Sequence, residues 1–297
     1  MLVTVVIPTF NVERYIAETM RSVVGQTHTG WEAVVVDDGS TDNTVSIVAS
    51  INDSRVRVIQ QANQGGAAAR ERGFDERNRS SDAVIFFDHD DRLRATGLAS
   101  LVTRLTERPD CVASHGLAAY MDEHGKPQKP GRYESYLRRR GTSGDTTFDT
   151  LSIFNHIPIG AILIRSEAKL LAGKFDPKFK YAHDWEYWLR LSMQGPIAFT
   201  DQVIYDYRVH SASMSQTSDR FAEDDLTVWA HYIKDKSIPE QFRRRALTGF
   251  RIAQTRQLRR KGPKAVRRLI RLQFAEARRI WKDATNLART FDESDII

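Results

Sequence analysis

Two short segments, AVVVDD (33–38) and AVIFFDHDD (83–91), carry the clearest structural signal in this 297-residue chain. Each is a short apolar run, rich in Val, Ile or Phe, that ends abruptly in aspartates. Such runs are typical of strands in a parallel sheet that is covered on both faces. Ligands of open α/β sheets bind at the C-terminal ends of the strands. Five aspartates in two clusters at such an edge indicate a divalent cation together with a nucleotide.

The flanking sequence alternates between strand and helix signals over the first hundred residues. The predicted strands are 3–8, 33–38, 56–60 and 83–88, and the predicted helices are 13–26, 44–51, 67–77 and 96–108. This order favours a three-layer α/β fold with a mostly parallel central sheet. The pattern is less regular from 111 to 180. Beyond the first hundred residues we expect strands at 111–122 and 157–165, a helix at 183–193 and extended segments over 197–210.

Composition and targeting signals favour a cytoplasmic globular protein. The chain is 41% hydrophobic and 28% charged, which is typical of soluble domains. Its single cysteine, Cys111, excludes an internal disulfide and fits a reducing compartment. The start, MLVTVVIPTFN (1–11), lacks a basic n-region and a cleavage site, so we interpret it as a strand and its turn. No apolar stretch has the length that crosses a bilayer.

The charge is distributed unevenly. Residues 241–297 contain 16 Lys and Arg against 5 Asp and Glu, whereas the remainder contains 28 against 33. Within this basic tail, 264–291 has apolar residues on one helical face and arginines over much of the rest. Three interpretations remain open: packing on the body or on a second subunit, contact with an anionic membrane surface, and nucleic-acid binding. No recognised nucleic-acid module supports the last of these, so no nucleic-acid partner is expected.

Seven sequence blocks, taken in order, resemble the inverting family 2 glycosyltransferases, which have the GT-A fold and use nucleotide-sugar donors. The resemblance covers about residues 3–215. The blocks are VTVVIPTFN (3–11), Glu13, VVVDDGSTD (34–42), NQGGAAAR (63–70), FFDHDDRL (86–93), HDWEYWLRL (183–191) and YRVHSASMS (207–215). The resemblance implies a Rossmann-like GT-A catalytic domain over 1–215, with a nucleotide-sugar half (1–110) and an acceptor half (111–215). A basic helical extension would follow over 216–297.

The resemblance implies a metal site at the second aspartate cluster. In that family the Asp-x-Asp segment holds the metal and the donor ribose, which suggests Asp90 as the principal ligand with Asp88 and Asp91 beside it. Mn²⁺ or Mg²⁺ takes such oxygen ligands and neutralises charge on a departing diphosphate. The resemblance also brings His210 to the metal and Arg208 to the diphosphate. Capping of the next helix by Asp91, and a structural role for His210, are the alternatives.

The donor site is implied at the ends of the first strands. The resemblance places the nucleotide base at Asp37 or Asp38, and the sequence does not decide between them. A turn that leads into the next helix is the alternative for this pair. Arg70 follows the NQGG turn and is expected near the donor, or else in a surface ion pair. The expected donor-binding residues are Pro8, Thr9, Phe10, Glu13, Asp37, Asp38, Arg70, Asp88 and Arg208.

Asp184 is the candidate catalytic base. Transfer of a sugar to a hydroxyl needs a group that removes the acceptor proton, and in the resembling family the corresponding Asp has this role. The family has Glu before this Asp, whereas this chain has His183, which puts acceptor choice and pH dependence in doubt. The alternative for Asp184 is an N-cap of 185–193. His156, His183 and Trp185 are the candidate acceptor contacts.

Together these features predict a metal-dependent glycosyltransferase that uses a UDP-sugar. The expected acceptor is a saccharide or glycolipid hydroxyl in cell-surface polysaccharide or lipopolysaccharide synthesis. The basic tail would add peripheral contact with the inner face of the membrane, or a homo-oligomer. Two rivals are a nucleotidyltransferase and a non-catalytic carbohydrate- or partner-binding protein. The absence of a basic Gly-rich loop in IPTFNVERY (7–15) speaks against the first, and the intact aspartates speak against the second. Sequence does not name the sugar, acceptor or linkage.

Overall fold

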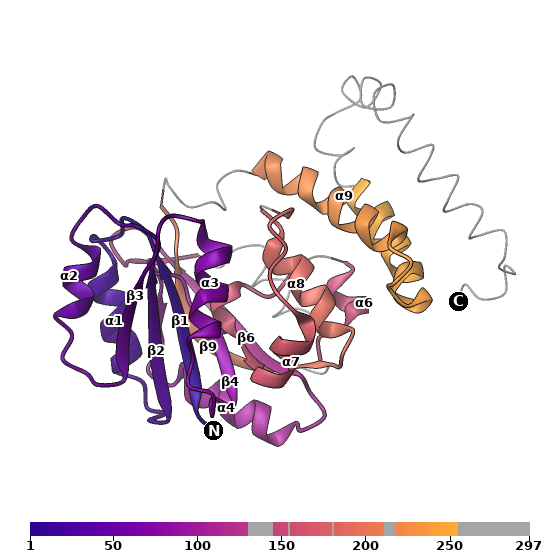
Figure 1. Ribbon diagram of the computed structural model, residues 1–297. Helices are drawn as coiled ribbons and strands as arrows, with labels where there is room; N and C mark the ends of the chain where they lie inside the picture. Colours follow the sequence, from indigo (N-terminus) through magenta and orange to yellow (C-terminus); the bar gives the residue numbers. More distant parts are fainter. Residues whose placement is uncertain (130–144, 154, 180, 211–217, 255–297) are drawn as a thin grey trace, which may run out of the picture. The chain divides into compact units, whose positions relative to one another are not determined.

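The computed structural model describes residues 1–129, 145–153, 155–179, 181–210 and 218–254 (Figure 1). The chain divides into two compact units. The first comprises Met1–Thr147, Asn155–Lys178 and His183–Gln216, and the second comprises Phe148–Phe154, Phe179–Ala182 and Thr217–Ile297. The aspartate clusters and Asp184 all belong to the first unit. Two inserts from the middle of the chain join the second.

The first half of the sheet is parallel, as predicted. Its strands run in the order β3-β2-β1-β4. They are β1 (Val3–Thr9), β2 (Trp31–Asp37), β3 (Val56–Gln60) and β4 (Ala83–Phe86). In register, Thr9 lies beside Asp37 and Val6 lies beside Phe86, so β1, β2 and β4 end close together at one edge. This register places the segments after these strands, and their aspartates, at a common edge.

Four helices alternate with these strands, and their bounds are close to the predicted ones. They are α1 (Ile16–Val24), α2 (Thr44–Ala49), α3 (Gly66–Asp75) and α4 (Gly97–Glu107). Helix α3 packs so closely on the sheet that a Cβ at Gly73 would lie 2.3 Å from Val6 Cγ1. A glycine is therefore required at this crossing, and α3 is held firmly above β1.

The second half of the sheet is mixed. It continues from β4 in the order β8-β6-β9-β5, with β7 paired to β6. The strands are β5 (Arg92–Leu93), β6 (Ala113–Met121), β7 (Pro127–Gln128), β8 (Ile162–Arg165) and β9 (Ile197–Arg208). Strand β8 is antiparallel to both β4 and β6, whereas β6 and β9 are parallel. The expectation of a mostly parallel sheet therefore holds for β1 to β4 and needs correction beyond them.

The helix that carries Asp184 was predicted closely, whereas the segment before it was not. Helix α8 spans His183–Ser192. The predicted strand at 157–165 begins instead as a 3-10 turn, Ile159–Ala161, and only Ile162–Arg165 is extended. A further helix, α7 (Ser166–Ala172), follows directly and was missed. The run IPIGAILIR is continuously apolar, so its periodicity could not distinguish a buried turn from a strand.

The second unit has an aromatic core of its own. Its described helices are α6 (Phe148–Leu151), α9 (Ser218–Lys234) and a helix over 240–254. The Phe148 ring centroid lies 5.7 Å from that of Tyr232 and 4.9 Å from that of Phe242. The helix predicted at 264–291 lies outside the described residues. In the described part of the chain, no helix combines the length and the apolar character that crossing a membrane requires.

Candidate active site

Asp38 organises the loop that precedes α3. Its carboxylate accepts hydrogen bonds from the backbone N–H of Gln64 at 2.8 Å and of Gly65 at 2.7 Å. It also accepts one from Gln61 Nε2 at 2.8 Å. Gly65 has a φ of 88°, a conformation that favours glycine. Asp38 is thus engaged in shaping the NQGG turn.

Asp37 differs from Asp38 because one of its carboxylate oxygens accepts no hydrogen bond from the described residues. The residue is only 1% exposed, and its Oδ2 accepts a hydrogen bond from the backbone N–H of Ser40 at 3.2 Å. Its Oδ1 is buried and has no hydrogen-bond partner among the described residues. A buried acceptor without a partner is costly, and such atoms need an explanation. Of the two aspartates, Asp37 is therefore the one with an oxygen free to accept an N–H from a ligand.

The end of β1 contributes one exposed side chain to this edge. Phe10 is 45% exposed, whereas Thr9 is buried and its hydroxyl donates to the Val36 carbonyl at 3.3 Å. The Pro8 carbonyl is 2.8 Å from His89 Nδ1. Glu13 accepts hydrogen bonds from the backbone and side-chain nitrogens of Asn43, so in this structure it secures the start of α2.

The second aspartate cluster forms an ion pair with Arg70 and a carboxylate–imidazole contact with His210, and it stays partly open. Arg70 Nη2 donates to Asp88 Oδ1 at 2.6 Å, and the Arg70 side chain is 9% exposed against 26% for Asp88. Asp90 Oδ2 lies 2.8 Å from His210 Nε2, with side chains 19% and 14% exposed. The structure thus brings Arg70 to Asp88, 18 positions away, and His210 to Asp90, 120 positions away. The His210 ring also stacks on Tyr15, with centroids 5.3 Å apart.

Asp91 points into the protein. It is 1% exposed, and its Oδ1 accepts a hydrogen bond from the backbone N–H of Arg208 at 2.8 Å. Burial raises the pKa of Asp91 well above its usual range, and the nearby charges of Asp90 and Asp88 raise it further. Its geometry is that of a residue that fixes the end of β9 beneath the cluster.

Arg208 is likewise enclosed. Its guanidinium donates to the Asp90 carbonyl at 2.7 Å and to the Glu18 carboxylate at 2.7 Å. Further bonds reach the carbonyls of Asp122 and Glu123. With its side chain only 2% exposed, Arg208 supports the aspartate loop from behind. Glu18, which sequence reasoning did not identify, is the carboxylate that balances this buried charge.

Asp184 is the second residue of α8 and is partly buried. Its Oδ1 accepts a hydrogen bond from the Trp185 N–H at 2.7 Å, and its Oδ2 accepts one from Asn155 Nδ2 at 3.1 Å. The neighbouring His183 ring lies 5.9 Å from the Phe175 ring, and Trp185 is 3% exposed. Asn155 is a contact that sequence reasoning missed.

His156 lies in the core. It is 1% exposed, and its Nε2 is 2.8 Å from the Thr146 hydroxyl, which is in turn 2.8 Å from His115 Nε2. Its imidazole is held inside the protein by these contacts with Thr146 and His115. We expected His156 to contact an acceptor, but the structure places it in a buried position that supports the surrounding segments.

The donor set of the aspartate cluster fits a cation that is shared with a phosphate group. Among the described residues, no three His, Cys, Asp or Glu side chains gather closely enough to hold a metal by themselves. Asp90 and His210 converge at 2.8 Å. Mg²⁺ is usually held by one or two carboxylates, and substrate phosphates and water complete its shell. An incomplete protein shell of this kind is therefore compatible with a metal that arrives with a diphosphate.

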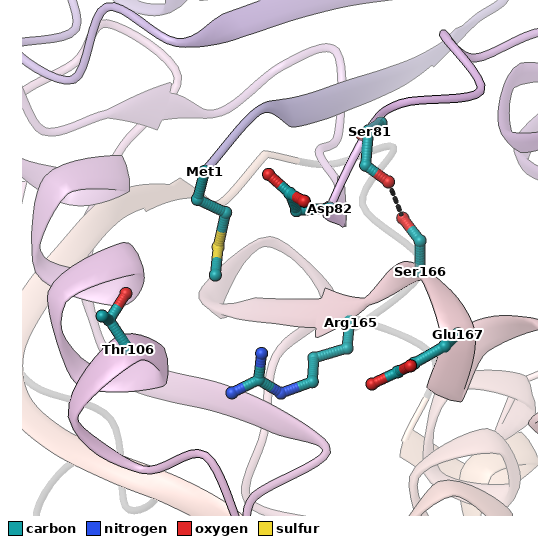
Figure 2. Close-up of a pocket in the computed structure, with 7 residues that line it drawn as sticks. All are labelled: Met1, Ser81, Asp82, Thr106, Arg165, Ser166 and Glu167. Atoms are coloured by element: carbon teal, nitrogen blue, oxygen red, sulfur yellow. Dashed lines mark hydrogen bonds between the residues drawn. The ribbon is translucent and has the colours of Figure 1, made fainter.

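A separate cavity of about 550 Å³ lies at the other end of the strands (Figure 2). It is lined by Met1, Ser81, Asp82, Thr106, Arg165, Ser166 and Glu167. Met1 and Asp82 precede β1 and β4, so this cavity is at the edge opposite to the aspartate clusters. The Arg165 guanidinium is already occupied by the carbonyls of Cys111 and Leu105. Nothing in its lining suggests chemistry.

The sequence is similar to those of known glycosyltransferases. Residues 4–168 match the model of "Glycosyl transferase family 2". The chain is 27% identical over 232 residues to "Putative teichuronic acid biosynthesis glycosyltransferase TuaG" of Bacillus subtilis, covering 77% of this chain and 87% of that protein. It is 28% identical to "Uncharacterized glycosyltransferase YibD" of Escherichia coli, covering 81% and 71%.

Solved structures identify the fold. S. aureus TarS in complex with UDP-GlcNAc superposes with a TM-score of 0.67 at 20% identity, over 84% of this chain and 71% of that one. The mannosyltransferase PcManGT of Pyrobaculum calidifontis, in complex with GDP-Man and Mn²⁺, gives 0.64 at 19% identity, over 93% and 80%. The α/β sheet, parallel in its first half and mixed in its second, is the GT-A fold of these glycosyltransferases. The family model covers more than half of the sequence, and the chain is therefore a glycosyltransferase that belongs to glycosyl transferase family 2.

Proposed function

We propose that this glycosyltransferase transfers a sugar from a UDP-sugar to a hydroxyl of a saccharide or glycolipid, with inversion at the anomeric carbon. The observation that carries the donor assignment is the buried Asp37 Oδ1, which has no partner among the described residues. The imide N–H of uracil is a donor that suits such an acceptor. Phe10 is exposed and directly follows the adjacent strand β1, so it offers an apolar face at the same edge of the sheet.

Arg70 and Asp88 form the donor side of the proposed site. Arg70 is buried and held by a charge-assisted bond to Asp88, which fixes the guanidinium at the start of α3. A guanidinium in this position suits a diphosphate oxygen. We assign Pro8, Thr9 and Asp38 to shaping the pocket and Glu13 to supporting α2. Arg208 and Asp91 hold the aspartate loop from within.

Asp90, His210 and Asp88 are the residues that would hold Mn²⁺ or Mg²⁺. When bound, such an ion neutralises negative charge on the leaving diphosphate. The carboxylate and imidazole that meet at 2.8 Å supply an oxygen and a nitrogen ligand. Because Asp91 is turned inward, it is assigned to positioning and not to the metal. The likeness to a structure that contains GDP-Man and Mn²⁺ supports the use of a divalent metal.

Asp184 is the proposed general base. As the acceptor oxygen bonds to the anomeric carbon, its proton passes to an Asp184 carboxylate oxygen. The bond from that carbon to the diphosphate oxygen breaks, and the diphosphate leaves with the electron pair. Attack on the face opposite to the leaving group inverts the anomeric centre. A carboxylate that is partly buried at the start of a helix is suited to this task.

The acceptor class is proposed from the relatives. One relative carries teichuronic acid biosynthesis in its name, which supports an acceptor in cell-surface polysaccharide synthesis. We assign residues 1–215 to catalysis, with the donor half in 1–110 and the acceptor half in 111–215. Residues 216–297 form the basic extension, to which we assign membrane contact or self-association in the cytoplasm. His183 remains the proposed acceptor contact, with Trp185 as a buried wall behind it.

A binding and turnover experiment tests this function. The thermal unfolding midpoint is measured with UDP-, GDP-, dTDP- and CMP-sugars, each with Mn²⁺ and with EDTA. A ligand that binds only the folded protein stabilises it by about 2.7 kcal/mol at a hundredfold excess over its Kd. We expect a metal-dependent shift with UDP-sugars, and Asp184→Asn should keep this shift while losing transfer. A shift with another nucleotide alone would overturn the UDP assignment, and full turnover by Asp184→Asn would overturn the base.

A further inference from the structure

Asn155 touches the proposed base. Its Nδ2 is 3.1 Å from Asp184 Oδ2, although the two residues are 29 positions apart. The orientation of the Asn155 amide is fixed independently, because its Oδ1 accepts a hydrogen bond from the Ile157 N–H at 3.2 Å. With the oxygen committed to that N–H donor, the amide NH₂ must face Asp184.

The two residues that follow Asn155, His156 and Ile157, are both held by hydrogen bonds. His156 is buried and lies 2.8 Å from the Thr146 hydroxyl. The Ile157 carbonyl accepts a hydrogen bond from Trp188 Nε1 at 2.9 Å. Trp188 lies on α8, the same helix as Asp184, and is fully buried. Helix α8 therefore carries Asp184 and also holds the segment that presents the Asn155 amide to it.

Thr146 extends this anchoring to the sheet. Its backbone N–H and C=O both bond to Ile197, each at 2.8 Å. Ile197 is the first residue of β9, the strand that ends at Arg208 under the aspartate cluster. Hydrogen bonds thus link β9 to Thr146 and Thr146 to His156, which is the chain neighbour of Asn155.

We propose that Asn155 is a positioning residue that orients the Asp184 carboxylate. This inference rests on the proposed role of Asp184 as base. An N–H that donates to a carboxylate oxygen restricts rotation of the group. With Oδ1 bonded to the Trp185 N–H and Oδ2 to Asn155, the carboxylate plane is set, and one lone pair on each oxygen stays available for the acceptor proton.

The other titratable groups of α8 are engaged elsewhere. Glu186 is 2% exposed and pairs with Arg190 at 2.7 Å. The phenol of Tyr187 is buried, which raises its pKa far above neutrality. His183 packs its ring against Phe175. Among the described residues, the neutral amide of Asn155 donates to Asp184 from outside α8. A charge introduced at residue 155 would therefore act directly on Asp184.

The test replaces Asn155 by its isosteric acid. In Asn155→Asp the Ile157 N–H keeps an acceptor, but a second carboxylate faces Asp184 where an amide stood. Two carboxylates at this separation do not both ionise readily, so one pKa rises. We expect the acid limb of the kcat profile to move upward by about one pH unit or more, with kcat at neutral pH about tenfold lower. Asn155→Ala should shift the limb less and should also lower kcat. The KM for the donor should be unchanged in both variants.

A matched control separates charge from structure. Asn78 is exposed, and its Oδ1 accepts the Ser80 N–H, so Asn78→Asp adds the same charge to a similar turn far from Asp184 in the chain. The control should keep the wild-type profile. If Asp184→Asn retains turnover, the base assignment and this inference both fail. If Asp184→Asn is inactive but both Asn155 variants keep the wild-type acid limb, the inference about Asn155 fails alone.

Discussion

The Lys169 ammonium lies 3.0 Å from the Glu71 carboxylate, in a buried position that joins α3 to α7. Lys169 is 2% exposed and Glu71 is 8% exposed. The Phe74 and Tyr187 rings lie 4.8 and 5.3 Å from the ammonium, and the Phe175 N–H donates to Glu71. Burial lowers the pKa of Lys169, and the Glu71 charge opposes that shift. Each charge is thus tolerated because the other is present.

Removing one member of this pair should destabilise the protein strongly. Lys169→Met leaves the Glu71 carboxylate buried without its cation, and breaking such a pair typically costs about 3–5 kcal/mol. The double variant Glu71→Gln/Lys169→Met should recover a large part of that loss. Urea unfolding measures both free energies. Lys174→Met is the matched control, because Lys174 and Asp75 form an exposed pair. Its free energy of unfolding should differ from that of the wild type by less than about 1 kcal/mol. Equal losses in the single and double variants would contradict the interpretation.

Arg70 should contribute to donor binding more than to folding. Arg70→Ala removes a guanidinium that is fixed by Asp88, so we expect the KM for the donor to rise by about tenfold or more. Arg70→Lys keeps the charge but loses the planar guanidinium, so its KM for the donor should lie between those of the wild type and Arg70→Ala. Arg72→Ala is the control, since Arg72 is exposed and pairs with Glu76 on the same helix. An unchanged KM in Arg70→Ala would remove this residue from the donor site.

Asp37 and Asp38 should separate into a binding and a folding role. Asp37→Asn offers an amide in place of the unpartnered oxygen, so the affinity for UDP should fall by at least tenfold with little change in thermal stability. Asp38→Asn replaces one of the two oxygens that accept the Gln64 and Gly65 N–H groups by an NH₂, so one backbone N–H loses its acceptor and the unfolding midpoint should fall instead. Calorimetric titration with UDP and thermal unfolding distinguish the two. Loss of UDP affinity confined to Asp38→Asn would reverse the assignment.

Much of the frame could be predicted because its signals are local. The strand at 56–60 has the predicted bounds, and α8 differs from its predicted range by one residue. Apolar runs and helical spacing are properties of neighbouring residues, and the aspartate clusters follow those runs directly. The direction of β8 and the two-residue strand β5 leave no such local signal, so the mixed half of the sheet was not anticipated.

The supporting contacts of the site could not be predicted for a different reason. Arg208 and Glu18 are 190 positions apart, and nothing in either local sequence indicates the other. Asn155 lies beside His156, the residue to which the sequence drew attention, yet the structure buries the histidine and points the asparagine at Asp184. Which of two adjacent side chains faces a site depends on tertiary packing, which periodicity alone does not encode in an irregular segment.

Cys111 should be unreactive in the folded protein. It is 1% exposed, and burial raises the pKa of its thiol to about 11. At pH 8 the thiolate fraction is therefore roughly two-hundredfold below that of a free thiol with a pKa near 8.5. Labelling by a thiol reagent should be at least a hundredfold slower in buffer than in urea. Because the thiol ionises at lower pH in the unfolded protein, the free energy of unfolding should fall as the pH rises from about 8.5 to 11. Cys111→Ala should not show this part of the pH dependence. Fast native labelling would contradict the buried placement.

Asp90 and His210 should matter for the cation and not for the fold. The two side chains meet at 2.8 Å but are both partly exposed, so replacing either leaves no buried charge behind. Asp90→Ala should abolish the extra thermal shift that Mn²⁺ gives to UDP binding, and His210→Ala should weaken it, while the midpoint without ligands stays near the wild-type value. His28 follows α1, is partly exposed and contacts the Met1 carbonyl, so His28→Ala should keep the wild-type response to UDP and Mn²⁺. Thermal unfolding with UDP, with Mn²⁺ and with both together resolves these cases, since the coupling between the two ligands is what Asp90 is proposed to supply. An Asp90→Ala protein that stays fully active and is still stimulated by Mn²⁺ would remove Asp90 from the metal site, and the aspartate loop would then have to act on the donor through Asp88 and Arg70 alone.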